Sequence, residues 1–453
     1  MTTSTEYTAK DNFIKHFTDN KNQIFEGLSQ DIIEIRTDAF EHFKEVGFPT
    51  KKEEDWRFTD LKKVLDPNYT HIYSPKQIDF KVADLFQCDV PDLETSVLTL
   101  FNGFFPINES AIQVLENGVI LGSFAAALKQ YPELVKKHYT KLAHKNDGLV
   151  ALNTALANDG IFVYIPKNVV IEKPIQIVNI VSSQEDIYIE HRNLFIAEEN
   201  SSAKVVICDH SLYFNKSFVN SVTEIHAGAN AHFDCYRIQN SSNNSSKIAS
   251  TYVNQERDSV FTSNIVTLHG GFVRNNIDVA MNGEGCESNL YGLYLTDREQ
   301  HIDNNTKVYH NFPNCTSREK YKGILDDNAT GVFSGRVVVQ IDAQKTNAFQ
   351  SNNNILLTDT AKIDTKPQLE IYADDVKCSH GATVGQLDMD AMFYLQARGI
   401  PKEEARMMLM HAFTGEVANT IKIDALRDRI NGLLEKRLRG EMSRCNNCVI
   451  KCG

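Results

Sequence analysis

The stretch from Asp374 to Thr383, DDVKCSHGAT, places a cysteine and a histidine two positions apart, at Cys378 and His380. In a strand, residues i and i+2 share a face, with their Cα atoms roughly 6.5–7 Å apart. A thiolate and an imidazole held this way are ligands that iron or an iron–sulfur cluster accepts. Two ligands are too few to complete the coordination of such a site. The remaining ligands would have to come from elsewhere, including another chain.

The same pair has two other interpretations. Val376 shares the face of Cys378 and His380, which predicts that this face points into a core. A buried cysteine mostly behaves as a small hydrophobic residue, and a buried histidine is usually only hydrogen-bonded. A nucleophile with its base fits less well, because side chains at i and i+2 run parallel rather than toward each other. The spacing alone leaves ligands and core residues both open.

A second group of cysteines lies at the end of the chain, where CNNCVIKCG contains Cys445, Cys448 and Cys452. Their C-x2-C-x3-C spacing suits a metal ion, but a fourth ligand is missing. The pattern therefore predicts either transient capture of a metal or cluster, or an oxidation-prone tail. The other cysteines stand singly, and we interpret them as structural: Cys88, Cys208, Cys235, Cys286 and Cys315.

Composition narrows the function classes. The 453 residues are 42% apolar and carry a formal net charge of −12. Nucleic acids and anionic membranes both demand a basic surface, so neither is expected as a partner. No apolar run is long enough to span a bilayer, and the first residues, MTTSTEYTAKDNFIKHF, contain no apolar signal segment. We expect a cytoplasmic protein with reduced thiols.

Motifs of self-sufficient enzymes are missing from the sequence. It has no G-x-x-x-x-G-K-[ST] loop, so no ATP site is expected, and neither H-E-x-x-H nor G-x-S-x-G occurs. The adjacent pairs Asp326–Asp327 and Asp374–Asp375 would face opposite sides of a strand, unlike the paired carboxylates of a glycosidase. We therefore expect no enzymatic activity. A solenoid enzyme that acts on polysaccharide is the alternative from another class.

The patterning divides the chain into five parts. Residues 1–65 repeat apolar positions at helical spacing, and 66–155 are mixed. Short β-branched and aromatic runs with period-two alternation fill 156–385. Residues 386–440 are helical again, and 441–453 form the cysteine-containing tail.

The strand-like runs recur at a fixed period. One series starts at positions 28 or 29 residues apart, and a second series interleaves with it from Ser221 to Gln368. The first series begins at Ala203, Ala231, Val260, Ser288 and Ser317. Strands without helices at such a period predict a β-solenoid, in which each coil contributes two strands. A β-sandwich would give no reason for the regular period.

Two stretches resemble a known family. Residues 331–417, from GVFSGRVVVQ to MHAFTGEV, closely resemble the C-terminal half of the SufB/SufD family of the SUF iron–sulfur cluster assembly machinery. Residues 47–61, GFPTKKEEDWRFTDL, resemble the SufD branch and include the one tryptophan, Trp56. The resemblance implies a right-handed parallel β-helix flanked by helical domains, a mainly β fold that agrees with the period.

The resemblance also implies partners. SufD-like chains pair with a SufB-like paralogue, and each binds a SufC-like ABC-type ATPase through its C-terminal helices. That assigns ATPase docking to about 390–425, with Pro401, Met408, Leu409 and Phe413 as candidate residues. Met408, Leu409, Ala412, Val417 and Ile421 are also predicted to lie along one helical stripe.

Residue by residue, VKCSHGAT matches the SufD motif, which makes His380 and Cys378 candidates for contact with a transient cluster at the SufB-like interface. The SufB branch carries a Gln-Cys dipeptide where this chain has Gln350 and Ser351. Serine removes the thiolate, so we expect no cluster on this chain alone at that place. A purely structural subunit and a homodimer in isolation remain alternatives, and the sequence leaves a flavin in the complex open.

Overall fold

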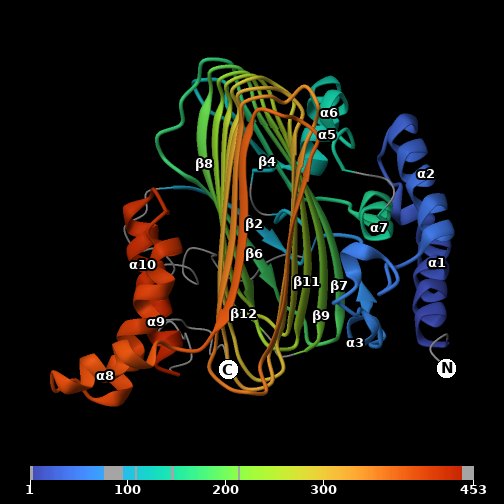
Figure 1. Cartoon of the computed structure of the whole chain (residues 1–453). Coiled ribbons are helices and arrows are strands. Elements are labelled where there is room, and N and C mark those ends of the chain that lie inside the picture. The colour runs from blue at the N-terminus through green and yellow to red at the C-terminus, as the bar shows by residue number, and fades with distance from the viewer. Residues whose placement is uncertain (1–3, 76–94, 108–109, 144–146, 213–214, 441–453) are drawn as a thin grey trace.

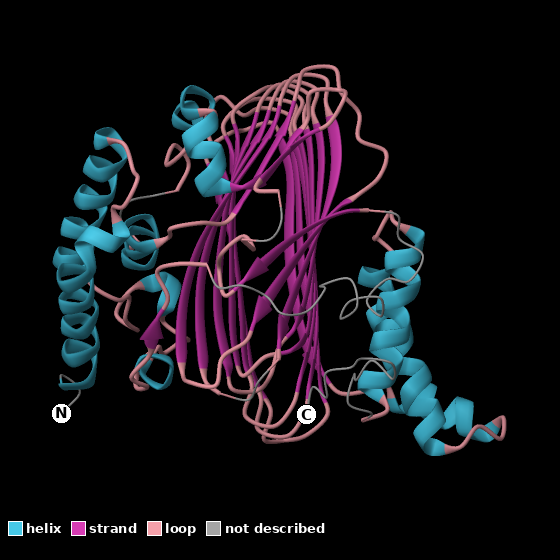
Figure 2. Ribbon diagram, turned by 180° about the vertical axis from the view of Figure 1, so that it is seen from behind, coloured by secondary structure: helices cyan, strands magenta, loops and turns pink. Residues whose placement is uncertain are grey.

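The computed structural model describes residues 4–75, 95–107, 110–143, 147–212 and 215–440. It has a tall stack of strands with helices on two opposite sides (Figure 1). The N-terminal helices lie beside one sheet and the C-terminal helices beside the other, as the view from behind also shows (Figure 2). The structure confirms the predicted mainly β class, with a parallel solenoid between helical regions.

The described strands form two sheets, which we call sheet A and sheet B. Sheet A contains β1 (Thr70–His71), β3 (Ile112–Val114), β4 (Ile120–Ser123), β5 (Ile161–Ile165), β7 (Ile187–Ala197), β9 (Ser217–Ala227), β11 (Ser245–Gln255), β13 (Phe272–Met281), β15 (His301–His310), β17 (Thr330–Val339) and β19 (Lys362–Ile371). Sheet B contains β2 (Ser96–Phe101), β6 (Ile175–Val181), β8 (Ser202–Ser211), β10 (His232–Asn240), β12 (Val260–His269), β14 (Glu287–Thr296), β16 (Thr316–Leu325), β18 (Thr346–Leu356) and β20 (Val376–Gly385).

From β6 onward the chain alternates between the two sheets, and each strand up to β18 pairs in parallel with the strand one coil before and the strand one coil after. The register aligns residues about 30 positions apart into columns that run along the solenoid. One column of sheet B contains Ala203, Phe233, Phe261, Ser288, Ser317, Ala348 and Cys378. This register explains the period of the sequence, because each repeat is one coil.

One corner of each coil needs a residue with positive φ. Asn168, Asn200 and Asn230 take φ values of 62°, 57° and 55° at this corner. Asparagine tolerates this left-handed conformation better than most residues. The three side chains also join into a ladder, since Asn200 Nδ2 donates to Asn168 Oδ1 at 2.9 Å and Asn230 Nδ2 donates to Asn200 Oδ1 at 2.9 Å. The asparagines of the turns therefore hold successive coils in register.

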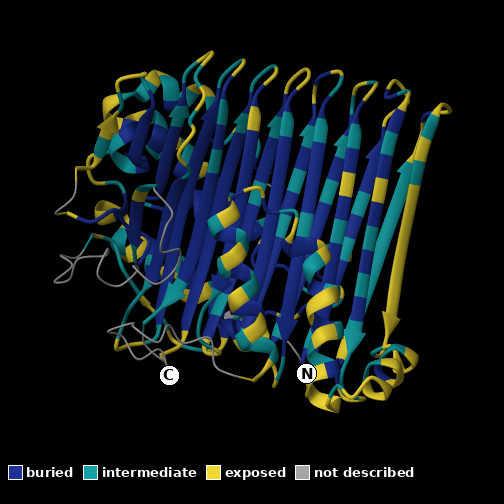
Figure 3. Ribbon diagram, turned by 90° about the vertical axis from the view of Figure 1, so that its left-hand side faces the viewer, coloured by how far each residue is buried: buried dark blue, intermediate teal, exposed yellow. Residues whose placement is uncertain are grey.

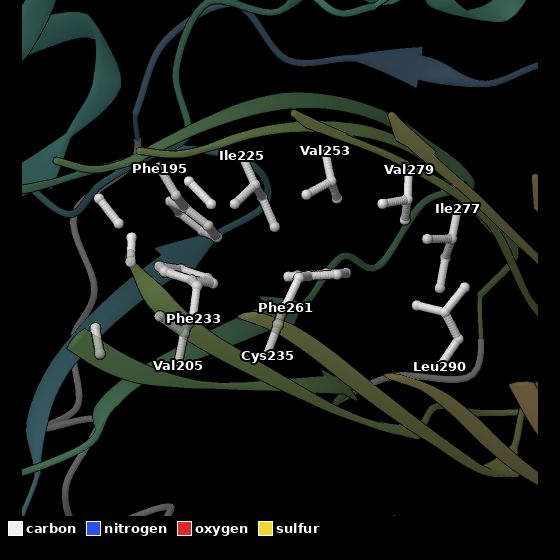
Figure 4. Close-up of a cluster of buried hydrophobic side chains, with 14 of the residues drawn as sticks. Phe195, Val205, Ile225, Phe233, Cys235, Val253, Phe261, Ile277, Val279 and Leu290 are labelled. Atoms are coloured by element: carbon white, nitrogen blue, oxygen red, sulfur yellow. The ribbon is translucent and has the colours of Figure 1, made fainter. Parts of the chain in front are cut away.

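Apolar side chains from both sheets fill the inside of the first coils. Phe195, Ile225 and Val253 point inward from sheet A toward Phe233 and Phe261 of sheet B (Figure 4). Leu98, Leu100, Phe105, Val119 and Leu121 belong to the same cluster and come from the segment between 95 and 123. Residues 66–155, which the sequence left as a mixed region, therefore supply strands β1 to β4 to the two sheets and close the N-terminal end of the core.

The N-terminal helices are α1 (Ser4–Ile24), α2 (Gln30–Val46), the 3₁₀ turn η1 (Glu54–Trp56) and α3 (Lys62–Leu65), followed by α5 (Phe124–Gln130), α6 (Pro132–His138) and α7 (Gly148–Leu156). Helix α7 begins where the Asp147 side chain accepts hydrogen bonds from the N–H groups of Leu149 and Val150. Phe40, Phe43 and Leu152 are among the residues that bury these helices against the outer face of sheet A.

Charged side chains fasten η1 to sheet A. The Arg274 guanidinium lies 3.8 Å from the centroid of the Trp56 ring and forms a buried ion pair with Asp303. Asp303 also accepts a hydrogen bond from Thr59 Oγ1 at 2.5 Å, and Arg274 Nη2 donates to the carbonyl oxygen of Asp55 at 2.8 Å. A cation over an aromatic face gains further strength when water is excluded. The 47–61 segment is thus attached to the middle of the solenoid.

The C-terminal helices α8 (Met389–Ala397), α9 (Lys402–Ala418) and α10 (Asp424–Leu438) follow the last strand. Helices α9 and α10 lie along the outer face of sheet B (Figure 1), where Met410, Val417 and Leu434 pack on residues such as Tyr236 and Leu293. Ion pairs at the margin support this contact, among them Lys322 Nζ to Glu416 Oε1 at 2.7 Å and Arg437 Nη1 to Asp297 Oδ2 at 2.7 Å.

We predict that Asp303→Ala detaches η1 from sheet A. The substitution leaves the Arg274 guanidinium buried without its carboxylate, which costs about 3–5 kcal/mol of the free energy of unfolding. Trp56 is the only tryptophan and lies against Arg274, so urea titration followed by tryptophan fluorescence reports this region directly. The fluorescence transition of Asp303→Ala should occur at a lower urea concentration than that of the wild type.

Glu299→Ala is the matched control for this experiment. Glu299 forms an ion pair with Lys63 at 4.0 Å, but both side chains are more than four-fifths exposed. Exposed pairs contribute little because water and salt screen them, so the fluorescence transition should stay in place. Equal midpoints for Asp303→Ala and Glu299→Ala would contradict the anchoring role of the Arg274–Asp303 pair.

Candidate functional site

The solenoid ends in strands that have a neighbour on one side only. Strand β20 pairs with β18, and β19 pairs with β17, and these two are the terminal strands of their sheets at this end. Most residues of β20 are exposed, in contrast to the buried strands of the central coils (Figure 3). Unpaired N–H and C=O groups along such an edge form a template for another strand. We call this part of the molecule, β19 and β20, the open end.

The open end carries both residues of the C-x-H pair. Cys378 continues the column of Ala348, is half-buried, and packs against the apolar core. Burial raises the pKa of its thiol above the ordinary value. His380 continues the column of Gln350 and is exposed to solvent. The two side chains thus share the face that lines the solenoid, but no further coil of the described chain covers them.

A polar column leads inward from His380. Its last three members are Glu319, Gln350 and His380, whereas Val205 and Leu290 stand at earlier coils of the same column. Glu319 and Gln350 are each 3% exposed. The column therefore changes from mostly apolar to polar as it approaches the open end.

Glu319 is a buried acid that forms no ion pair with any residue that the structure describes. Burial raises the pKa of its carboxyl to about 7, although a hydrogen bond from Thr306 Oγ1, at 2.5 Å from Oε2, opposes the shift. Gly335 makes room for Gln350, because a Cβ at that position would lie 2.3 Å from Gln350 Nε2. A group that holds or releases a proton near neutral pH thus lies two coils below His380.

Sequence reasoning did not single out Glu319 or Thr306. A signal was present, since Glu319, Gln350 and His380 recur at nearly the repeat period. Ser351, which the resemblance predicts to stand where the SufB branch has a cysteine, is half-buried, and its Oγ donates to the carbonyl oxygen of Glu319 at 3.3 Å. It neighbours Gln350 in the strand and so points to the opposite face of sheet B.

The four residues assigned to ATPase docking lie in different environments. Pro401 is exposed at the start of α9, and Met408 is 45% exposed. Leu409 is half-buried. Phe413 packs against the cluster between α9 and sheet B, with the Lys322 ammonium 4.2 Å from its ring centroid. Phe413 therefore holds the helix on the solenoid, while Met408 faces away from it.

The predicted apolar stripe of α9 is partly wrong. Val417 and Ile421 are buried as expected, but Met408 and Ala412 are exposed. The helix also buries Ala405, Met410 and Ala418, and the last two belong to the cluster that α9 shares with sheet B. Helix α8, which lies almost wholly within the predicted docking segment 390–425 but supplied none of the four candidate residues, projects away from the sheets (Figures 1 and 2). Helix α8 contacts α9, and we call the exposed large apolar side chains of these two helices the α8–α9 patch: Met389, Phe393, Tyr394 and Met408.

Cys445, Cys448 and Cys452 lie outside the described residues. Among the residues that the structure describes, no group of three or more His, Cys, Asp and Glu side chains is placed to hold a metal ion. Within the same part of the chain, none of the helices has the length and apolar character to cross a membrane. The open end and the α8–α9 patch are therefore the surfaces that merit a functional interpretation.

Glu319 makes stability depend on pH in a direction opposite to that of an ion-paired acid. Its pKa is higher in the folded chain than the ordinary 4.5, so folding favours the protonated form. The contribution of Glu319 to the free energy of unfolding is fully present below about pH 4.5, and it is lost as the pH rises from there to about 7. We predict that Glu319→Gln removes this loss, which amounts to on the order of 3 kcal/mol.

The measurement is the free energy of unfolding of both proteins between pH 5 and pH 8, taken as a difference so that other titrating groups cancel. The free energy of unfolding of the variant should rise relative to that of the wild type as the pH increases. A difference that stays constant over this range would show that Glu319 has no raised pKa in the folded chain.

Comparison with known proteins agrees with these features. The sequence model of the SufBD core domain family, described as SUF system FeS cluster assembly, matches residues 179–413. The sequence model of the SufBD N-terminal region matches residues 7–177. An iron–sulfur cluster assembly SufBD family protein of Synechocystis sp. is 31% identical over 416 residues, which cover 88% of this chain and 89% of the relative.

Two further relatives carry a more specific name. The iron–sulfur cluster assembly protein SufD of Escherichia coli is 28% identical over 401 residues, which cover 87% of this chain and 90% of the relative. SufD of Bacillus subtilis is 28% identical over 454 residues, which cover 97% and 100%. The two family models together reach from within the N-terminal helices, through the solenoid, into α9. The chain belongs to the SufBD family of iron–sulfur cluster assembly proteins.

Proposed function

We propose that this chain is a SufD-like, non-ATPase subunit of a cytoplasmic SUF assembly complex. In this proposal the open end pairs with a SufB-like paralogue, and a nascent iron–sulfur cluster passes through the interface as cargo. The observation that carries the proposal is the position of His380. It lies exposed on the last strand of the solenoid, on the face that lines the interior.

The chemistry of the open end supports pairing with another chain. Strand β20 offers an unpaired edge about ten residues long, and strand addition would satisfy its backbone groups. Apolar side chains surround this edge, including Phe349 at 43% and Tyr372 at 59% exposure. A second copy of the chain offers the same edge, so a homodimer is the alternative when the paralogue is absent.

His380 is the better ligand of the pair. Its imidazole is exposed and can approach a cluster held mainly by the partner, whereas the Cys378 thiol is half-buried and has a raised pKa. Ser351 provides no thiolate. A site shared with the partner therefore needs one imidazole from this chain and thiolates from elsewhere. A purely structural subunit is the competing function, and it requires no contact between His380 and the cluster.

The proposal assigns the α8–α9 patch to a SufC-like ATPase. This patch combines two aromatic and two methionine side chains, which are residue types enriched in protein interfaces. ATP would be hydrolysed in that partner, because this chain has no G-x-x-x-x-G-K-[ST] loop. Phe413 would act indirectly by holding α9 on sheet B.

We predict that His380→Ala leaves assembly with both partners intact but lowers cluster formation by about tenfold or more, as expected for a lost ligand contact. The measurement is anaerobic reconstitution of the co-purified complex, followed by iron and sulfide analysis. Lys377→Ala is the control, because Lys377 is exposed on the same strand and alternation places it on the other face.

The double variant Cys378→Ala/His380→Ala separates ligand and structural functions. Normal cluster yield from an intact complex that contains this variant would refute the ligand role and favour the purely structural subunit. Failure of the wild-type chain to bind either partner would overturn the proposed function as a whole.

We predict that Phe393→Glu and Met408→Glu abolish co-purification of the SufC-like ATPase while the SufB-like partner is retained. A charge in the centre of an apolar contact should cost at least about 2 kcal/mol, or roughly 30-fold in affinity. Val170→Glu is the control, since Val170 is 62% exposed but belongs to the first coil. Unchanged ATPase binding by both patch variants would place the docking surface elsewhere.

A further inference from the structure

Two of the cysteines that stand singly in the sequence are neighbours in the structure. Cys286 directly precedes β14 and Cys315 directly precedes β16, and these two strands pair in parallel. The N–H of Thr316 donates to the carbonyl oxygen of Cys286 at 2.9 Å, which continues the ladder to the first of the two cysteines. Cys286 and Cys315 therefore occupy the same corner of consecutive coils.

This corner normally needs only a small hydrogen-bond donor. Ser201 Oγ donates to the carbonyl oxygen of Glu198 at 2.6 Å, and Thr346 Oγ1 donates to that of Ala343 at 2.8 Å. Cys286 Sγ makes the equivalent contact to Gly283 at 3.2 Å. A hydroxyl serves this purpose at least as well as a thiol, which is the weaker donor. Turn capping alone therefore does not require sulfur at two successive coils.

The two sulfur atoms converge on one acceptor. Cys286 Sγ lies 3.2 Å and Cys315 Sγ 3.3 Å from the carbonyl oxygen of Gly283. Adjacent strands lie about 4.8 Å apart, which falls within the Cα separation of about 4.4–6.8 Å that a disulfide accepts. A bond between these sulfurs therefore needs side-chain rotation but no rearrangement of the coils.

The local electrostatics favour reaction at one of the sulfurs. A hydrogen bond with the Cys315 thiol lowers the pKa of Cys286 to about 7, and the same interaction raises that of Cys315. A thiolate next to a protonated thiol is the arrangement that an attacking and a resolving cysteine need. Both residues are buried, but the turn above Cys286 includes the exposed Asn282 and Glu284, so a single turn separates the sulfurs from solvent.

We propose that Cys286 and Cys315 form a redox-active dithiol that closes into a reversible disulfide between consecutive coils when the chain meets hydrogen peroxide. The Cys286 thiolate attacks one peroxide oxygen, an S–O bond forms, the O–O bond breaks, and the departing hydroxide takes up a proton. The Cys315 sulfur then attacks the sulfenic sulfur of Cys286, an S–S bond forms, and the second oxygen leaves as water. The two sulfurs together lose two electrons, peroxide becomes two waters, and an external dithiol reverses the change.

The test is peptide mapping of the purified full chain after exposure to hydrogen peroxide, with free thiols blocked before digestion. A cross-linked peptide that contains Cys286 and Cys315 should appear and should vanish after reduction with dithiothreitol. Cys286→Ser and Cys315→Ser keep a turn-capping donor and should fold normally, as circular dichroism will show, but neither should give the cross-link. Cys235→Ser is the matched control, because Cys235 is a buried core thiol whose pKa is raised. It should give the cross-link in full.

Glutathione in the same tube shows that the oxidant was active. If glutathione is consumed while Cys286 and Cys315 remain free thiols, the proposal is wrong. Conversion of either residue to sulfinic or sulfonic acid without a cross-link would also overturn it. These outcomes do not depend on the SUF assignment, because the experiment needs no partner and no cluster.

Discussion

Backbone pairing between successive coils is the constraint on which the rest of the structure depends. Every strand of the central solenoid has a neighbour on each side, so its N–H and C=O groups are satisfied only while the stack continues. At the N-terminal end, β2 to β4 and the side chains around Leu98 and Leu121 close the core. At the other end no further strand of the described residues lies beside β20, and the exposed edge is a direct consequence of ending the repeat there.

The same register also decides how side chains pack inside the solenoid, because each column places one residue of every coil against its neighbours. Gly292 and Tyr321 share one column, and a Cβ on the glycine would lie 2.1 Å from the tyrosine ring. In the next column the order is reversed, with Tyr294 facing Gly323. Large and small residues alternate between coils, so a change at one coil alters the space available at the next.

The sequence predicted the solenoid because the repeat leaves a direct trace in it, as the series from Ala203 to Ser317 shows. Contacts between distant parts of the chain left no comparable trace. The nearness of Cys286 and Cys315 is different, because each lies two residues before a start of that series, at Ser288 and Ser317, so the period already implied it and it was missed because each cysteine was considered singly. Nothing in the pattern of charged residues marked Arg192 and Glu224 as partners, although they form an ion pair that is almost completely buried. In α9, alternative helical faces fitted the same apolar residues, and only contact with sheet B distinguishes Met410 from Met408.

The open end combines two properties that conflict in an isolated chain. An apolar interior exposed at a free edge promotes uncontrolled association, yet an edge that is blocked cannot accept a partner. The column Glu319, Gln350 and His380 reconciles these demands, since it becomes polar over the last coils while Phe349 and Tyr372 stay exposed around it. The burial that favours the protonated form of Glu319 is already complete two coils below the edge. A strand added at β20 would therefore change the surroundings of the exposed His380 far more than those of Glu319.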